Sequence, residues 1–206
     1  MNLLTQNSKL KKTSKTTGKK IFNFSIPAYK TKSGKKTCPF AKECVKFCYA
    51  QKGNYTRFPK IQDLMEQKYK ISKTNTFIPL MNEEIIKKKV THIRIHDSGD
   101  FYSINYLLKW IQIANTNKDV IFYAYTKSIP FFKGAKAGKP TVKIPNNLKI
   151  IFSEGSKRDI LINNNSDRHA RIFKSKELLN AAGYIDASDN DLKAITSNKK
   201  VGLVYH

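Results

Sequence analysis

The chain has 206 residues, of which 40% are hydrophobic, and its 39 lysines and arginines outnumber 15 acidic residues, for a formal net charge of +24. This apolar content excludes wholesale disorder, and no apolar run is long enough for a transmembrane helix or a secretory signal. We therefore expect a cytoplasmic protein whose charge favours nucleic acid or another polyanion, and not a membrane, as its partner.

The elements expected along the chain begin after a lysine-rich segment. Residues 1–19 have no apolar periodicity, which predicts a flexible basic arm in front of a single α/β domain over residues 20–206. Apolar patterns of helical period occupy residues 59–75, 78–89 and 103–115, and Ser175 and Ser188 have the residue type that caps a helix. Five apolar runs have the composition of buried strands, at residues 21–28, 91–96, 120–126, 148–156 and 201–206.

The alternation of strands and helices predicts a parallel sheet covered on both faces. A closed eight-stranded barrel typically needs about 250 residues. The fold class is therefore α/β, either a partial (β/α) barrel or an open, mostly parallel sheet of about five to six strands. In such sheets the carboxyl ends of the strands meet at one rim, where α/β proteins bind their ligands.

Three cysteines, Cys38, Cys44 and Cys48, fall in one loop after the first expected strand. Their odd number and a reducing compartment disfavour disulfides. Three thiolates can ligate three irons of a [4Fe–4S] cluster and leave the fourth iron open. Zinc is the alternative, with His96 or His206 as a fourth ligand, and three unligated cysteines are the third possibility. Lysines surround the loop and should offset the charge of a cluster and lower the thiol pKa values: Lys35, Lys36, Lys42 and Lys46.

Polar residues follow the other expected strands at the same rim. His92, Arg94 and His96 should share one face of the second strand, which makes His96 a candidate catalytic residue. Asp97 and Asp100 equally suit turn and helix-cap roles, although Asp100 and Glu154 are also candidate catalytic acids. Arg94 could neutralise Asp100 or Glu154, or bind a carboxylate or phosphate of a substrate.

A basic surface with interleaved aromatic residues is expected near the long loop over residues 127–147. Bases stack on aromatic rings and phosphates pair with cations, so this composition suits a single-stranded nucleic acid; a solvated basic face explains it equally well. The candidate nucleic-acid contacts are Lys133, Lys136, Lys139, Lys143, Arg158, Arg168 and Arg171.

Four segments together resemble the phage-encoded gene-88-protein family: TCPFAKECVKFCYAQKG, IRIHDSGDFYS, FYAYTKS and VGLVYH. The resemblance extends from about Phe22 to His206 and leaves the basic arm outside. It implies a small protein of a phage or mobile element, working in the host cytoplasm, and brings no established activity with it.

At the level of the fold, the chain also resembles a shortened radical-S-adenosylmethionine barrel, in which a three-cysteine loop after the first strand holds a [4Fe–4S] cluster. The cysteine spacing here is x5/x3 and not the usual x3/x2. This resemblance implies that Tyr49, Ser98, Gly99 and Asp100 contact S-adenosylmethionine, with Ser98-Gly99-Asp100 in the place of a Gly-Gly-Glu-like segment.

Two functions are therefore expected. The first is an iron–sulfur protein with a radical-S-adenosylmethionine-like site that acts on or near an anionic substrate such as a nucleic acid. The alternative is a nucleic-acid-binding protein without enzymatic activity, in which an iron–sulfur or zinc site is purely structural.

Overall fold

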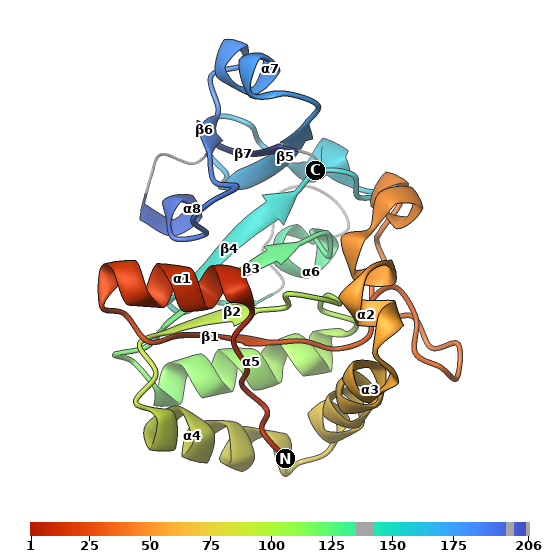
Figure 1. Cartoon of the computed structure of the whole chain (residues 1–206), viewed down its shortest axis with the longest axis vertical. Helices are drawn as coiled ribbons and strands as arrows, with labels where there is room; N and C mark the ends of the chain where they lie inside the picture. The colour runs from red at the N-terminus through yellow and green to blue at the C-terminus, as the bar shows by residue number, and fades with distance from the viewer. Residues whose placement is uncertain (135–141, 197–199, 205–206) are drawn as a thin grey trace.

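A computed structural model describes residues 1–134, 142–196 and 200–204 of the chain. Within this part, seven strands form one sheet in the order β1-β2-β3-β4-β5-β7-β6, and every neighbouring pair is parallel (Figure 1). The strands are β1 Ile21–Phe24, β2 His92–Ile95, β3 Ile121–Thr126, β4 Leu148–Ser153, β5 His169–Phe173, β6 Ile185–Asp186 and β7 Lys200–Val204.

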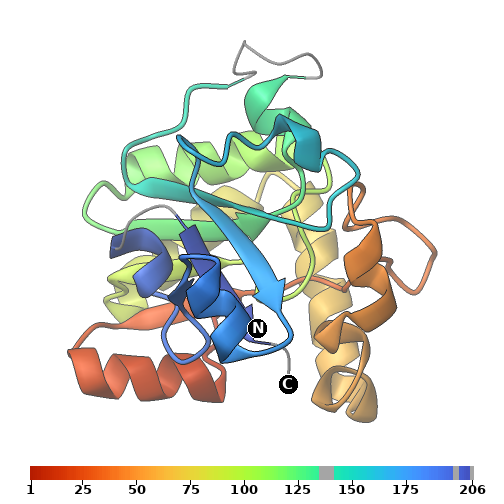
Figure 2. The same ribbon diagram turned by 90° about the horizontal axis from the view of Figure 1, so that it is seen from above.

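The sheet curls without closing, because β1 and β6 remain its two edges (Figure 2). This confirms the expected α/β class with an open, parallel, partly barrel-like sheet. The sequence prediction missed β5 and β6. β6 has only two residues, and β5 has the sequence HARIF, which alternates apolar residues with basic ones and lacks a continuous apolar run.

Eight helices occur in the described part of the chain, together with three short 3₁₀ turns. The predicted helices over 59–75, 78–89 and 103–115 are confirmed as α3, α4 and α5. The helices are α1 Ser8–Thr17, α2 Asn54–Arg57, α3 Pro59–Lys73, α4 Phe77–Lys88, α5 Ile104–Thr116, α6 Pro130–Lys133, α7 Lys176–Ala181 and α8 Lys193–Thr196, and the turns are η1 Glu43–Phe47, η2 Tyr49–Gln51 and η3 Asp159–Leu161.

The two serines expected to cap helices behave differently. Ser175 caps α7, where its side chain accepts a hydrogen bond from the Leu178 amide. Ser188 does not begin a helix. Its hydroxyl accepts a hydrogen bond from the Val204 amide at 3.0 Å and so joins the segment before α8 to β7.

Each face of the sheet has its own core. On one face, α4 and α5 pack against β1, β2 and β3 around an aromatic centre, in which the Trp110 ring lies 5.4 Å from both Phe24 and Phe77. On the other face, Leu10 of α1 and Ile195 of α8 join Tyr123 of β3 in a smaller cluster. Figure 1 shows α1 lying along the sheet on this second face, away from α4 and α5.

The amino-terminal segment differs from the expected flexible arm. Asn7 caps α1 by accepting a hydrogen bond from the Leu10 amide at 2.8 Å. Leu3, Leu4 and Leu10 are only 3%, 1% and 1% exposed, and the amides of Leu3 and Leu4 donate to the carboxylate of Glu84 in α4. Periodicity missed this docking because three leucines among many lysines produce no sustained apolar stripe.

A helix that crosses a bilayer needs about 20 predominantly apolar residues, and this requirement applies to each helix in the described ranges. None of them is both long and apolar enough to cross a membrane.

Candidate functional site

A cavity of about 190 Å³ lies at the carboxyl ends of the strands. All three cysteines line it, together with residues that follow β2 and β3 and the last residue of β4. The structure thus brings the cysteine loop to the rim where the strand ends meet. Its polar lining residues are Cys38, Cys44, Cys48, Tyr49, Arg94, His96, Asp97, Ser98, Asp100, Tyr125, Lys127, Ser153 and Arg171.

Hydrogen bonds at the start of the cysteine loop and near its middle hold the loop over the rim. At its start, the Thr37 hydroxyl donates to the Pro27 carbonyl at 2.7 Å, directly after the β1 segment. Farther along, the Lys42 amide donates to the carbonyl of Gly155, and the Lys157 amide donates to the carbonyl of Phe40. These last two contacts attach the loop to the segment that follows β4, so the loop spans the rim from β1 to β4.

The three cysteines are free thiols. In the described ranges, no group of three or more His, Cys, Asp or Glu side chains is arranged to hold a metal ion. The Tyr29 amide donates to the Cys38 sulfur at 3.4 Å, a contact that would stabilise a thiolate.

Burial is the main cause of the raised pKa values of Cys38 and Cys44. It raises the pKa of Cys38 to about 12, with a further upward contribution from the charge of Asp100. Burial also raises the pKa of Cys44, against the opposing charge of Lys127. The expectation that the surrounding lysines lower the thiol pKa values is therefore wrong for these two residues, because desolvation of the thiolate outweighs attraction to exposed cations.

The segment after β2 turns tightly beneath the cysteine loop. Gly99 has φ of +85°, and a Cβ there would lie 2.2 Å from Cγ1 of Ile26, so only glycine fits this close approach. The neighbouring Ser98 hydroxyl is buried without a hydrogen-bond partner in the described part of the chain. Gly99 therefore shapes the floor of the cavity, and Ser98 has unused hydrogen-bonding capacity at its wall.

Asp100 is buried and fully engaged by the protein. Its Oδ1 accepts from the Thr126 hydroxyl at 2.6 Å and from the Phe101 amide at 2.7 Å, and its Oδ2 accepts from the Lys127 amide at 2.9 Å. Burial raises the pKa of this carboxyl, although the three hydrogen bonds oppose the shift. Asp100 thus ties the end of β2 to the end of β3.

The strand alternation predicts that His96 shares the face of Arg94, and this prediction is wrong. Its φ of +66° reverses the alternation, and its Nε2 pairs with the Tyr106 hydroxyl of α5 at 2.9 Å. The ring packs edge-on against Phe101, with centroids 4.7 Å apart. Burial lowers the pKa of His96 to about 3, so the imidazole is neutral at physiological pH and belongs mainly to the core.

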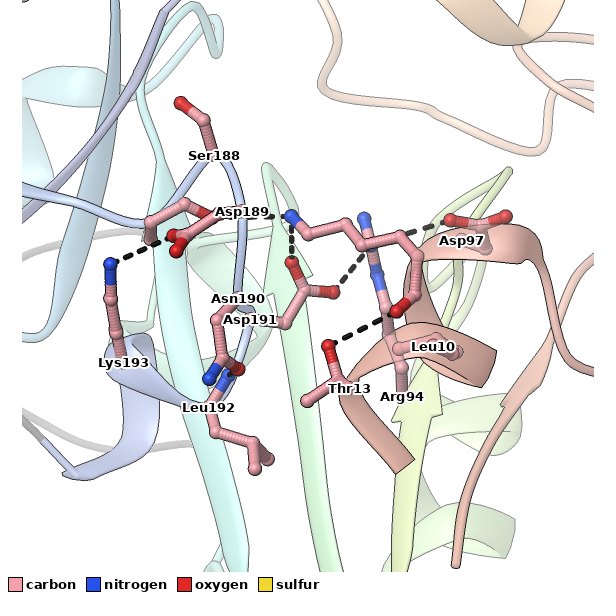
Figure 3. A network of polar contacts seen from close by, with 12 residues as sticks. Leu10, Thr13, Arg94, Asp97, Ser188, Asp189, Asn190, Asp191, Leu192 and Lys193 are labelled. Carbon is pink, nitrogen blue, oxygen red and sulfur yellow. Dashed lines mark hydrogen bonds and ion pairs between the residues drawn. The ribbon is translucent and has the colours of Figure 1, made fainter. Parts of the chain in front are cut away.

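Arg94 lies at the centre of a buried network that Figure 3 shows. Its Nη1 pairs with Asp191 Oδ2 at 2.6 Å and with Asp97 Oδ1 at 3.3 Å, and Asp191 also pairs with Lys9 of α1 at 2.5 Å. The Tyr55 hydroxyl donates to Asp97 Oδ2. Arg94 therefore neutralises Asp97 and Asp191, and not Asp100 or Glu154 as the sequence suggested.

Glu154 lies beside the cavity but is not among the residues that line it. Its Oε2 accepts from Arg171 Nε at 2.6 Å, and its Oε1 accepts from the Tyr184 hydroxyl at 3.4 Å. Tyr184 in turn pairs with Nε2 of the buried His169 at 2.8 Å. Glu154 therefore holds Arg171, which does line the cavity.

Of the remaining predicted site residues in the described ranges, Tyr49 and Arg171 line the cavity and the others do not. Tyr49 as a whole residue is 56% exposed, and its hydroxyl donates to the Asp97 carbonyl. Lys133 pairs with Asp167, Arg168 donates to the Ala194 carbonyl at 3.0 Å, and Lys143 and Arg158 are exposed. Three predicted residues lie outside the described ranges: Lys136, Lys139 and His206.

Sequence reasoning missed Lys127, which lines the cavity, and also Tyr55 and Asp191, which contact residues that line it. Lys127 follows β3 directly, so the rule that found the other strand ends could have found it; its Nζ donates to the Ser153 hydroxyl at 2.6 Å. Tyr55 and Asp191 lie away from any expected strand end. No local pattern marks them, because their contacts to Asp97 and Arg94 cross long distances in the sequence.

Comparisons with known proteins show the family to which the chain belongs. The family model described as "Gene product 88" matches residues 1–205. The chain belongs to the Gene product 88 family. The match includes the amino-terminal segment, which the resemblance noted from the sequence motifs left outside. This is consistent with the packing of helix α1 against the sheet. Membership in the gene-88 family is thus confirmed.

A curated relative of the Gene product 88 family is the "Gene 88 protein" of Mycobacterium phage L5, 32% identical over 102 residues. The match covers 44% of this chain and 43% of the relative, so this chain spans less than half the length of that protein. The relative's source supports the prediction of a phage protein. No solved structure matches the chain.

Proposed function

We propose that this chain is an iron–sulfur protein of a phage or mobile element, in which Cys38, Cys44 and Cys48 ligate a [4Fe–4S] cluster. The proposal rests on one observation: the three thiols of a single loop line the same cavity as the Ser98–Asp100 segment, at the carboxyl rim of a parallel half-barrel. The site would act on or near an anionic substrate such as a nucleic acid.

The residues present suit a cluster with three thiolate ligands. The Tyr29 amide already donates to the Cys38 sulfur, and hydrogen bonds to ligand sulfurs tune such clusters. Burial raises the pKa of Cys44, and the charge of Lys127 opposes this rise, so Lys127 would also offset the negative charge of a bound cluster. The thiols are not arranged around a metal ion in the structure, so loading requires the short turns η1 and η2 to move the sulfurs together.

A bound cluster with an open iron would supply a coordination position and an electron for S-adenosylmethionine or a substrate. The chain's own residues would prepare the space around it. Asp100 fixes the β2 and β3 ends relative to one another, Gly99 lets the backbone pack closely against Ile26 and so shapes the floor of the cavity, and the Ser98 hydroxyl, which has no partner in the described part of the chain, can bind a polar group of a cofactor.

The decisive measurement is the metal content and spectrum of protein purified without oxygen. We expect broad absorbance near ~400 nm, with iron and sulfide in equal amounts, and loss of both in Cys38→Ser, Cys44→Ser and Cys48→Ser. Ser98→Ala is the matched control, because it removes a hydroxyl from the same cavity without removing a thiol. Colourless wild-type protein without iron would disprove the proposal.

Activity is tested separately by reducing the loaded protein in the presence of S-adenosylmethionine. Cleavage of the cofactor is expected from wild type and not from the cysteine variants. A loaded protein that leaves S-adenosylmethionine intact would refute the radical chemistry while leaving the iron–sulfur site standing.

A second candidate function is a nucleic-acid-binding protein in which iron–sulfur or zinc only holds the loop. It is favoured by the engagement of the two candidate acids: Asp100 accepts three hydrogen bonds from the protein, and Glu154 is paired with Arg171. This function predicts one zinc or an inert cluster, and oligonucleotide affinity that falls steeply with salt. Affinity that does not change with salt would contradict it.

A further inference from the structure

Two arginines on different strands, Arg94 of β2 and Arg171 of β5, line the same cavity as the thiols. We propose that they bind the carboxylate or phosphate group of a small molecule in this cavity. The inference names the substrate class of the proposed site and to that extent rests on the proposed function.

Arg94 is held in one orientation by its surroundings. Its Nη1 is fixed by Asp191 and Asp97, and its guanidinium carbon lies 5.4 Å from the centre of the Tyr125 ring. Its Nε is buried without an acceptor in the described part of the chain, and the buried hydroxyl of Tyr125 also lacks a partner there. A buried polar group without a partner is costly unless a bound group satisfies it.

Arg171 is built in the same way on the other side of the half-barrel. Its Nε is fixed by Glu154 at 2.6 Å, and its guanidinium carbon lies 5.3 Å from the centre of the Tyr184 ring. Each arginine is therefore bound to a carboxylate and stacked on a tyrosine. A guanidinium fixed in this way loses little entropy on binding and is suited to bidentate recognition of a carboxylate or phosphate.

The charges around the cavity also favour an anion. Arg94, Arg171 and Lys127 line it, whereas two of the carboxylates that balance them, Asp191 and Glu154, are not among its lining residues. The acids that do line it, Asp97 and Asp100, have their oxygens engaged by protein donors. A ligand in the cavity therefore meets three cations, and two of the carboxylates that balance them, Asp191 and Glu154, lie outside its lining.

The size of the cavity selects a small molecule over a polymer. Its volume is about 190 Å³, and for comparison a cavity of about 150 Å³ in another protein accommodates benzene. A compact acid or phosphate fits such a space, whereas a nucleic-acid strand would have to remain outside and present one phosphate at a time.

The test is calorimetric titration of the full-length protein, purified without oxygen, with inorganic phosphate and separately with acetate at constant ionic strength. Wild type should bind one of the two saturably, and the anion that binds identifies the ligand group. Arg171→Gln should weaken that binding about tenfold, as expected for loss of a charge-assisted hydrogen bond. Arg158→Gln is the matched control, since it removes the same charge from an exposed position outside the cavity and should stay within about twofold of wild type.

A second readout does not depend on heat of binding. The bound anion should slow alkylation of the cavity thiols in metal-free wild type and in Arg158→Gln, but not in Arg171→Gln. The inference would be overturned if wild type showed no saturable binding of either anion, or if Arg171→Gln and Arg158→Gln weakened anion binding equally. It would also be overturned by tight binding of an oligonucleotide that depends on Arg171 when neither small anion binds.

Iron and sulfide content measured in the same preparations keeps this inference distinct from the proposed function. Protein that binds the anion but never holds iron would support the anion site and disprove the proposed cluster. Protein that holds iron but binds neither anion would support the proposed cluster and disprove the anion site.

Discussion

At position 96 the backbone enters the left-handed region, with φ of +66°, and this places the imidazole beside α5 and away from Arg94. The ring is then enclosed by Phe101 and Tyr106. A buried imidazole surrounded by aromatic rings is a poor general acid, because protonation would place a charge in an apolar site. At the scale of single residues, the local backbone conformation thus decides whether a histidine is available for chemistry.

His96 should make the free energy of unfolding depend on pH. Its pKa is about 3 in the folded chain against 6.5 as the ordinary value, so between these values the unfolded state binds the additional proton. Its contribution to stability is therefore complete above pH 6.5 and is lost as the pH falls toward 3. Asparagine tolerates positive φ, so His96→Asn can keep the backbone conformation. In urea unfolding, this variant should reduce the slope of the free energy of unfolding against pH by about 1.4 kcal/mol per pH unit between pH 6 and 4.

Tyr106→Phe is the control for this prediction. It removes the hydrogen-bond partner of the imidazole but leaves the titrating group in place, so it should lower stability without flattening the pH dependence. An unchanged slope in His96→Asn would show that His96 is not the group responsible.

At the scale of elements, the loop between β2 and α5 shows that a motif resembling a cofactor segment also has a packing role. The backbone of Gly99 lies against Ile26, which follows β1, at a distance that excludes a Cβ. The Ile26 amide also donates to the Ser98 carbonyl at 3.1 Å. This contact joins the ends of β1 and β2, and it places Ser98 and Asp100 at the cavity.

Gly99→Ala should destabilise the protein by about 2–4 kcal/mol, because positive φ and a clash with Ile26 both oppose the new Cβ. Gly18→Ala is the matched control: it also has positive φ, of +68°, but no atom lies within 4 Å of a Cβ there. We expect it to cost only about 1 kcal/mol. Chemical denaturation of both variants measures the difference, and equal losses would argue against the tight contact.

At the scale of the whole molecule, an open half-barrel must cover the inner face that a closed barrel would bury on itself. Here α1 and the segment around α8 do so, with Leu10, Leu192 and Ile195 packed against Tyr123 and Ile151. The ion pairs Lys9–Asp191 and Arg94–Asp191 join the same three parts of the chain. The amino terminus is therefore part of the fold that supports the cavity.

Leu10→Ala tests this role of α1. Since Leu10 is 1% exposed, its truncation should lower the free energy of unfolding by about 2–5 kcal/mol. Lys12→Ala on the exposed side of the same helix should change it by no more than about 0.5 kcal/mol. A flexible arm would make the two variants indistinguishable from wild type in urea unfolding.

The sequence by itself determined the class of the fold, because continuous apolar strands alternating with amphipathic helices can bury their surfaces only in a covered parallel sheet. It also determined that the cysteine loop follows β1 and that the gene-88 motifs lie at strand ends. Local apolar periodicity carries this information, and it was lost where the pattern is short or diluted, as in β5, β6 and α1.

Tertiary structure alone decided which side chains share the cavity and how they are paired. Arg94 meets Asp191 across 97 positions of the chain, Arg171 meets Glu154 from the next strand, and His96 turns away from both. Such pairings depend on the curl and stagger of the sheet, in which β5 begins where β4 ends, with His169 beside Phe152. Periodicity describes each element along its own axis, whereas these contacts arise from the packing of elements against one another.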